Sequence, residues 1–224
     1  MEKKAKLDYK KEYKDLYMPK KKPTLVKVPP MNFFMIDGKG TPDSEEYHSA
    51  MQSLYSFTFT IKMSKMSGNQ PPGYFEYVVP PLEGLWSCED GPFVFAKRDQ
   101  WIWTSMIRQP EFVTQEVYLN TKDEIAKKKT EIDVSKVRFE SLDEGLCVQI
   151  MHNGPYDQEQ SSIEQIIQYI EANNLELDFE SGRKHHEIYL SDPRRCKPEN
   201  LKTVIRYPVK TVSYTHLRAH ETAA

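Results

Sequence analysis

The sequence lacks the features that mark several common classes of protein. Its 224 residues include three cysteines, Cys88, Cys147 and Cys196, which lie far apart and form no CxxC pair. This usage is typical of reduced thiols, so we expect a cytoplasmic location. No apolar run approaches the roughly 20 residues that a membrane helix needs, and no apolar run follows the first charged residues as in a secretory signal. We therefore expect no membrane partner.

The sequence also lacks a large excess of positive or negative charge. The 31 lysines and arginines nearly balance the 33 aspartates and glutamates, for a formal net charge of −2, which gives no support to direct nucleic-acid binding. Lysines and prolines gather in residues 1–30, where we expect a basic N-terminal arm. Within it, Tyr9, Tyr13, Leu16 and Tyr17 recur at near-helical spacing, which indicates a short amphipathic helix that packs tyrosines on the body.

Common catalytic and cofactor-binding motifs are missing as well. The segment DGKG at 37–40 lacks the GxGxxG spacing, and the sequence contains no GK[ST], HExxH or GxSxG motif. His185 and His186 are adjacent, so on a strand they would point to opposite faces and could not readily share a metal ion. We expect neither a cofactor nor a metal site, and covalent hydrolase chemistry of the standard kind is disfavoured.

The apolar pattern predicts an α+β fold built from two similar modules. The first module, about 31–110, begins with a strand, passes through a glycine-containing turn and continues into a helix. Asp43 and Glu46 resemble the capping box that would start this helix. Two paired strands follow. Pro80 and Pro81 interrupt the first of them, which places it at a sheet edge or at a bend, because proline cannot donate to the ladder.

The second module, about 136–211, repeats this order. A strand with alternating apolar residues runs into the Asn153–Tyr156 turn, and a helix follows with isoleucine at positions 163, 166, 167 and 170. The segments HEIYLS and KTVIRYPVK are the two closing strands. A repeated unit whose sheet face needs covering favours a pseudo-twofold pair of strand–helix–strand–strand modules with antiparallel sheets. The alternative is a single α+β sheet without a ligand groove.

Two further segments complete the domain organisation. Thr121 and Glu124 form a T-x-x-E box, which predicts a connector helix through Lys129 between the modules. The last residues, 212–224, follow a finished strand and have no helical or strand period. They look like a non-native tail from cloning and, with His216 and His220, are left out of the fold prediction. The sequence carries no signal for the oligomeric state.

An aromatic set with one carboxylate remains as a candidate site. Trp101 and Trp103 share one face of a predicted strand, and Glu187 shares a face with Tyr189 on another. Aromatic walls hold flat or cationic ligands at about 0.5–2 kcal/mol per contact, and a carboxylate adds charge pairing. A buried glutamate without a partner has a raised pKa, which suits a proton acceptor. Further side chains at strand or turn positions could converge on this set: Phe33, Met35, Trp86 and Tyr156.

Structural roles stay open for the same residues. Tryptophans on one strand face are often core residues. Glu187 could equally be a surface carboxylate or the partner of Arg183 or Lys184. The pattern of residues alone does not choose between a ligand groove and ordinary packing.

Four segments of the chain together resemble the GyrI-like small-molecule-binding family. They read EYKDLYMPKKKPTLVKVPPMNFFMIDGKGTP, WSCEDGPFVFAKRDQWIWTSMIRQP, MHNGPYDQE and HHEIYLSDPRR…LKTVIRYPVK, and the similarity extends from Tyr13 to Lys210. The resemblance implies two pseudo-twofold modules with a central ligand groove, as in the effector-binding domains of multidrug-responsive regulators. It also implies that Glu187 is the central carboxylate and that Trp101, Trp103 and Tyr189 line the wall.

The resemblance leaves three classes of function open. The implied function is binding of a lipophilic, flat or cationic small molecule. The alternative is hydrolysis, since some stand-alone members open the cyclopropane ring of DNA-alkylating natural products, and no helix-turn-helix segment is present here. In that case Glu187 would accept a proton from the attacking water, and Tyr189 or Tyr156 would hydrogen-bond the oxygen that gains charge. The third class is a protein that binds and inhibits a DNA topoisomerase.

Overall fold

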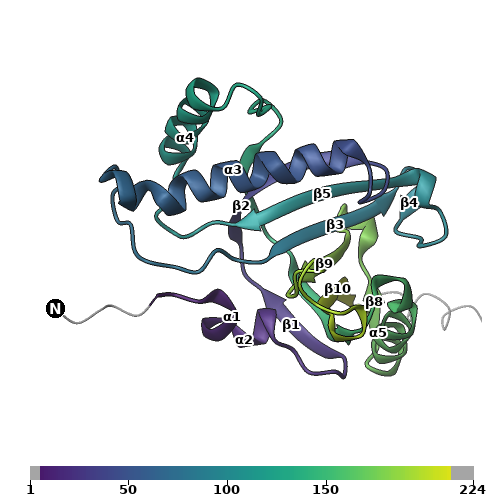
Figure 1. Cartoon of the computed structure of the whole chain (residues 1–224). Coiled ribbons are helices and arrows are strands. Elements are labelled where there is room, and N and C mark those ends of the chain that lie inside the picture. The colour runs from purple at the N-terminus through teal and green to yellow at the C-terminus, as the bar shows by residue number, and fades with distance from the viewer. Residues whose placement is uncertain (1–5, 213–224) are drawn as a thin grey trace, which may run out of the picture.

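A computed structural model describes residues 6–212, which fold around one continuous antiparallel sheet (Figure 1). The sheet order is β1-β7-β10-β9-β3-β5-β2-β6, with two short strands added to it, β4 on β3 and β8 on β10. The predicted α+β class is confirmed. The strands are β1 (Thr24–Val28), β2 (Met31–Lys39), β3 (Leu82–Cys88), β4 (Gly91–Pro92), β5 (Trp101–Arg108), β6 (Arg138–Leu142), β7 (Gly145–Asn153), β8 (Leu175–Leu177), β9 (His185–Tyr189) and β10 (Lys202–Thr211).

The two halves of the sheet repeat one arrangement. In chain order, β2, α3 (Glu45–Ser67), β3 and β5 form one half, and β7, α5 (Gln160–Ala172), β9 and β10 form the other. The last strand of each half lies between its first two strands, and β3 pairs with β9 at the centre, with Gly84 opposite Glu187. β3 is therefore a central strand, and the edge position suggested by Pro80 and Pro81 is wrong, because the ladder begins after the prolines at Leu82.

The short strands β1 and β6 are exchanged between the halves. β1 precedes β2 in the chain but pairs with β7, whereas β6 precedes β7 but pairs with β2. Residues 24–28 of the predicted arm are thus an edge strand of the second half. This long-range pairing ties the two halves together, because each first strand is flanked by a segment that belongs to the other half.

Both long helices cover the same face of the sheet, which we call the helical face. α3 lies over β2 and β5, and α5 lies over β7 and β10 (Figure 1). The isoleucines at 166 and 170 of α5 are buried there, as their spacing predicts. The helix start differs from prediction at α3, where Ser44 rather than Asp43 is the N-cap and accepts the Tyr47 amide. Strand partners place Glu187 on this face, opposite Ile205, and Ile188 on the other face.

The connector helix starts earlier than its predicted box. α4 spans Gln115–Lys128 with Thr114 as N-cap, and Thr121 lies inside the helix, where its hydroxyl donates to the Val117 carbonyl. An apolar stretch before Thr121 therefore belongs to the helix. Elsewhere within residues 6–212, single turns of 3-10 helix lie at Arg98–Gln100, Tyr156–Gln158, Phe179–Ser181 and Pro198–Asn200.

The N-terminal segment covers the second face of the sheet, which we call the back face. The predicted amphipathic helix is two separate turns, α1 (Tyr9–Glu12) and α2 (Lys14–Tyr17), which lie away from α3 (Figure 1). Tyr9, Leu16 and Tyr17 are buried. No helix in the described part of the chain is both long and apolar enough to cross a bilayer. Apart from Val212, the tail predicted at 212–224, with His216 and His220, lies outside the described residues.

Candidate functional site

Glu187 stands in the middle of β9, near the centre of the sheet, and is 7% exposed. One carboxylate oxygen, Oε1, lies 2.7 Å from Nε2 of His185, and the other, Oε2, accepts a hydrogen bond of 2.7 Å from the Tyr189 hydroxyl. The three side chains share a face because alternate residues of a strand do so. The expected Glu187–Tyr189 pair is therefore formed, and His185 completes it.

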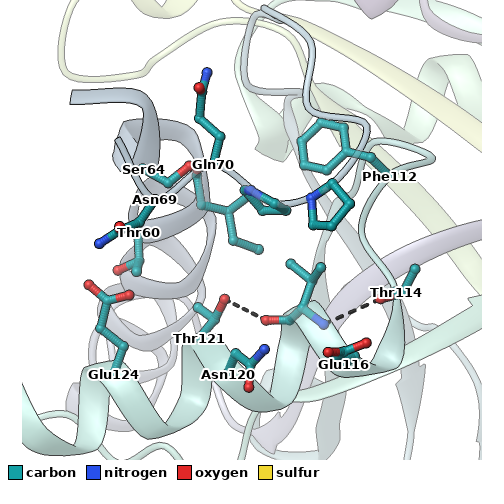
Figure 2. Close-up of a pocket in the computed structure, with 14 residues that line it drawn as sticks. Thr60, Ser64, Asn69, Gln70, Phe112, Thr114, Glu116, Asn120, Thr121 and Glu124 are labelled. Atoms are coloured by element: carbon teal, nitrogen blue, oxygen red, sulfur yellow. Dashed lines mark hydrogen bonds between the residues drawn. The ribbon is translucent and has the colours of Figure 1, made fainter. Parts of the chain in front are cut away.

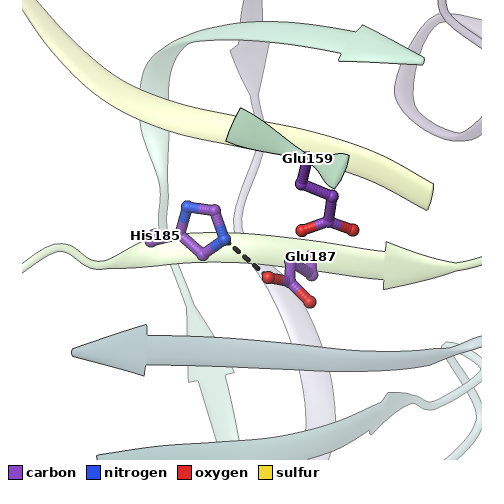
Figure 3. Close-up of side chains that lie close together, drawn as sticks. All are labelled: Glu159, His185 and Glu187. Atoms are coloured by element: carbon purple, nitrogen blue, oxygen red, sulfur yellow. Dashed lines mark hydrogen bonds and ion pairs between the residues drawn. The ribbon is translucent and has the colours of Figure 1, made fainter. Parts of the chain in front are cut away.

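Glu159 brings a second carboxyl group to the same point. It lies where the 3-10 turn after β7 meets α5, it is 3% exposed, and its carboxyl group faces that of Glu187 (Figure 3). Burial and the neighbouring Glu187 carboxylate raise the pKa of Glu159 well above its ordinary value. Burial alone would raise the pKa of Glu187 too, but hydrogen bonds from His185, Tyr189 and Glu159 outweigh it and lower the pKa. The pKa values of the two carboxyl groups are thus pushed apart, and Glu159 is the one that binds a proton more readily.

Aromatic side chains enclose this pair of carboxyl groups. Trp86 of β3 donates from Nε1 to the Tyr189 oxygen at 2.9 Å, and the Tyr156 ring stands edge-on to the Tyr189 ring at 5.8 Å. Phe93 stacks on the His185 ring with centroids 4.7 Å apart, and Tyr47 of α3 stacks on Trp86 at 6.4 Å. The site is thus an aromatic enclosure around two carboxyl groups.

Four predicted site residues meet at this point: Trp86, Tyr156, Glu187 and Tyr189. The other two predicted tryptophans, Trp101 and Trp103, lie further from Glu187. Trp101 packs on Trp86 at 5.7 Å with Arg98 over its other side, so it supports the wall from behind. Trp103 is fully buried beneath α3, against Gly38 and 5.0 Å from the Tyr47 ring. Both face the helical side of the sheet, as predicted from their shared strand face.

The expectation that Phe33 and Met35 converge on the candidate site is wrong. In the ladder Glu187 pairs with Gly84, Gly84 with Ser105, and Ser105 with Ile36, and paired residues of an antiparallel sheet share a face. Ile36 therefore faces the same side as Glu187, and its odd-numbered neighbours Phe33 and Met35 face the back. Both are buried in the core of the back face, so they cannot line a groove that contains Glu187.

Gly84 makes the contact between Trp86 and Tyr189 possible. A Cβ atom at this position would lie 2.7 Å from Nε1 of Trp86 and 3.1 Å from the Tyr189 hydroxyl oxygen. The first distance is below any normal contact, so a side chain here would push the two rings apart. The glycine thus serves close approach, one of the recurrent reasons for glycine inside a strand.

Glu159, His185 and Glu187 also have the donor types that bind a metal ion, with ligand atoms all within 4.8 Å of one another. The geometry fits a hydrogen-bonded group better. Ligand atoms about 2.0–2.2 Å from a tetrahedral zinc ion lie roughly 3.3 Å apart, whereas His185 Nε2 and Glu187 Oε1 are 2.7 Å apart. His185 and His186 do point to opposite faces, since His186 pairs with Glu144 on the back face.

Two hollows lie away from this group. One, of about 390 Å³, lies between the C-terminal half of α3 and the start of α4 (Figure 2). Two of its hydroxyls already bond within α4, because Thr114 accepts the Val117 amide and Thr121 donates to the Val117 carbonyl (Figure 2). The other, of about 470 Å³, lies beside α3 near Trp103 and Lys136. Glu187 lines neither hollow, and the candidate site is assigned from the two buried carboxyl groups and the aromatic side chains around them.

Sequence reasoning missed Glu159, His185 and Gly84 as parts of the site. Glu159 stands in the MHNGPYDQE segment, and the Gly154 there has a φ of 138°, a conformation that favours glycine. That turn directs the chain from β7 back over the sheet and so carries both Tyr156 and Glu159 to Glu187. A carboxylate three residues after the predicted turn residue Tyr156 was the available signal.

Comparison with protein-family models matches residues 21–210 to the GyrI-like small molecule binding domain. This chain therefore belongs to the GyrI-like small-molecule-binding family. Comparison with curated proteins gave no match.

Solved structures agree with this assignment. A structure described as a hydrolase from Listeria innocua is 49% identical, with a TM-score of 0.84, over 92% of this chain and 100% of that one. An uncharacterized conserved protein from Listeria innocua is 51% identical, with a TM-score of 0.87 over the same shares. The EcmrR C-terminal domain is 15% identical, with a TM-score of 0.51 over 85% of this chain and 98% of that one, and is similar in fold alone.

Proposed function

We propose that this small-molecule-binding domain hydrolyses a flat, lipophilic ligand held between its aromatic side chains. The observation that carries the proposal is the buried pair of Glu159 and Glu187, whose carboxyl groups face each other beside His185, with the pKa of Glu159 raised and that of Glu187 lowered. An ionised and a protonated carboxyl group side by side can accept one proton and donate another. Pairs of carboxyl groups with pKa values pushed apart are a common basis of acid–base catalysis.

The substrate class follows from the resemblance to a family whose members include enzymes that open the cyclopropane ring of dienone alkylators. Water attacks the ring methylene carbon and forms a C–O bond, while Glu187 accepts the proton that the water loses. The ring C–C bond breaks, and its electron pair moves through the conjugated system to the carbonyl oxygen. That oxygen becomes a phenol when it takes a proton from Glu159, so atoms and charges balance.

The two tyrosines have different roles in this proposal. The Tyr189 hydroxyl already donates to Glu187 and accepts from Trp86, so it orients the carboxylate. No hydrogen bond within residues 6–212 occupies the Tyr156 hydroxyl, which makes it the better donor to the substrate oxygen. Burial, with Glu159 and Glu187 nearby, raises the pKa of Tyr156 to about 12, so it stays protonated and able to donate.

The comparisons support hydrolysis without naming a substrate for this chain, because the Listeria innocua protein that is 49% identical is described as a hydrolase. Binding without chemistry is the second candidate. It is favoured by the complete hydrogen bonding of Glu187, which suits a fixed negative charge that pairs with a cationic ligand. A cytoplasmic location, with no membrane or nucleic-acid partner, is part of the same proposal.

The test is turnover of a cyclopropane-bearing dienone, followed by mass spectrometry. Glu187→Gln and Glu159→Gln should each slow hydrolysis by about 100-fold or more, a typical contribution of acid–base groups. Glu164→Gln is the matched control, because Glu164 lies on the exposed side of α5. Equal rates in the three variants would contradict the roles of the pair. Compound that is retained unchanged by the wild type would favour the binding candidate.

A further inference from the structure

The N-terminal residues 7–20, which we call the strap, are fixed to the back face at both ends. Leu7 forms a bridge with Tyr77, and the Lys20 carbonyl accepts the Met151 amide at 3.0 Å. The middle of the strap is α1 and α2 (Figure 1). A segment of this length with such short helices has little stability of its own, so its position depends on what it contacts.

Arginine and tyrosine side chains hold the first turn of the strap. The Arg108 guanidinium contacts the rings of both Tyr9 and Tyr13, at 4.5 and 4.4 Å from their centroids. Those two rings are stacked with centroids 5.7 Å apart, and the Tyr9 hydroxyl donates to Glu111 at 3.4 Å. These contacts attach α1 to the end of β5.

A buried ionic cluster lies beneath the second turn, formed by Glu83, Glu144, His186 and Arg206. Nε2 of His186 is 3.0 Å from Glu83, and Nδ1 of His186 is 2.8 Å from Glu144. Nη1 of Arg206 donates to Glu144 at 2.6 Å. The four side chains are buried, and two positive charges balance two negative ones when His186 is protonated. Such a cluster is strongly destabilising when it is broken or left incomplete.

The strap supplies hydrogen-bond partners to two side chains of this cluster. The Tyr17 hydroxyl donates to Glu83 at 3.2 Å, and Nη2 of Arg206 donates to the Leu16 carbonyl at 2.9 Å. The Asp15 carbonyl accepts from the Gln149 side chain. The second turn thus satisfies cluster atoms that would otherwise lack partners in the interior.

The cluster residues alternate along their strands with residues of the functional site. On β9, His186 lies between His185 and Glu187, and on β3, Glu83 precedes Gly84, which pairs with Glu187. Arg206 follows Ile205, which pairs with Glu187 on β10. Neighbouring residues of a strand point to opposite faces but share one backbone, so a shift of β9 at His186 moves Glu187 as well.

We propose that the strap is a positioning element of the functional site, and that the Tyr17–Glu83 contact holds β9 and β3 in the arrangement that brings Trp86 to Tyr189 and Glu187 to Glu159. Tyr17 is the positioning residue, since it acts through Glu83 and His186 and touches no ligand. The effect on turnover rests on the proposed function. The effect on β9 does not, because it is a property of the folded chain alone.

Tyr17→Phe tests this by removing the hydroxyl and keeping the ring. Tyr13→Phe is the matched control, because it removes a hydroxyl from the same strap while its ring stays on Arg108. Amide hydrogen exchange, read in peptides that cover 185–190, should be about tenfold faster in Tyr17→Phe and unchanged in Tyr13→Phe. A peptide from α3 should exchange at the wild-type rate in both variants.

Turnover provides the second measurement. Tyr17→Phe should lower kcat for the dienone by roughly three- to tenfold with an unchanged KM, since misplacement of Glu187 affects the reacting geometry more than ligand burial. Unchanged exchange at 185–190 would overturn the proposal, and so would equally faster exchange in α3, which would indicate general destabilisation. Faster exchange with unchanged kcat would make the strap purely structural. If the wild type shows no turnover, the proposed function fails and the exchange comparison decides the proposal by itself.

Discussion

Gly84→Ala should damage the functional site from within the sheet. The new methyl group would lie 2.7 Å from Nε1 of Trp86 and 3.1 Å from the Tyr189 oxygen, where the two side chains form a hydrogen bond of 2.9 Å. Overpacking costs about 1–3 kcal/mol, and the lost hydrogen bond adds about 1 kcal/mol. Alanine regains about 0.5–1 kcal/mol over glycine within a strand. The net loss of stability should therefore be about 1–3 kcal/mol.

The loss of function should exceed the loss of stability. Once Trp86 moves away, Tyr189 is free to turn from Glu187, and the carboxylate loses the hydrogen bond that orients its Oε2 atom. Turnover or ligand affinity should fall on the order of tenfold or more at temperatures where the variant is folded. The assays are urea unfolding and product formation, measured on the same preparations.

Gly38→Ala is the matched control for this change. Its new methyl group would press on the Trp103 ring, also on the helical face but away from Glu187. Gly38→Ala should lower the free energy of unfolding by an amount comparable to Gly84→Ala, while the folded Gly38→Ala variant keeps the turnover of the wild type. If Gly84→Ala is as stable as the wild type, or if the two variants lose turnover equally, the assignment of Trp86 and Tyr189 to the site is refuted.

Two further predictions concern stability. Burial alone would lower the pKa of His186, but Glu144 and Glu83 raise it from 6.5 to about 9. Protonated His186 therefore stabilises the folded state fully below pH 6.5, and the free energy of unfolding should fall by up to about 3 kcal/mol as the pH rises through 9. Urea unfolding between about pH 6 and 9.5 checks this, and constant stability would contradict it. Ser44→Ala should lower the free energy of unfolding by about 1 kcal/mol, because the Ser44 hydroxyl caps α3. Asp43→Ala should lower it much less. Equal losses of stability in thermal unfolding would refute Ser44 as the N-cap.

Local pattern was a sufficient guide to much of the fold. The isoleucine spacing predicted α5, and the pairing of β3 with β5 followed from two adjacent strand patterns. The repeated order of strands and helices predicted the symmetry of the halves, and the family resemblance singled out Glu187 as the central carboxylate. These features depend on neighbours in the chain or on several motifs taken together, which sequence reasoning can use directly.

Other features depend on contacts between distant segments. The exchange of β1 and β6 leaves no local signal, because each strand has the same pattern whichever partner it takes. The segment MNFFMI is apolar at almost every position, since both faces of β2 are buried, so its alternation could not show that Phe33 and Met35 face the back. Glu159 became a site residue only through a turn that folds it over β9.

The most direct test of the central claim is hydrolysis in water labelled with oxygen-18. The wild type should convert a cyclopropane-bearing dienone to a phenol that carries one labelled oxygen. Glu187→Gln should slow incorporation of the label by about 100-fold or more, because the group that accepts the proton from the attacking water is lost. Label incorporation at the same rate in Glu187→Gln, or compound bound covalently to the wild-type protein without labelled product, would contradict the role of Glu187 as the base.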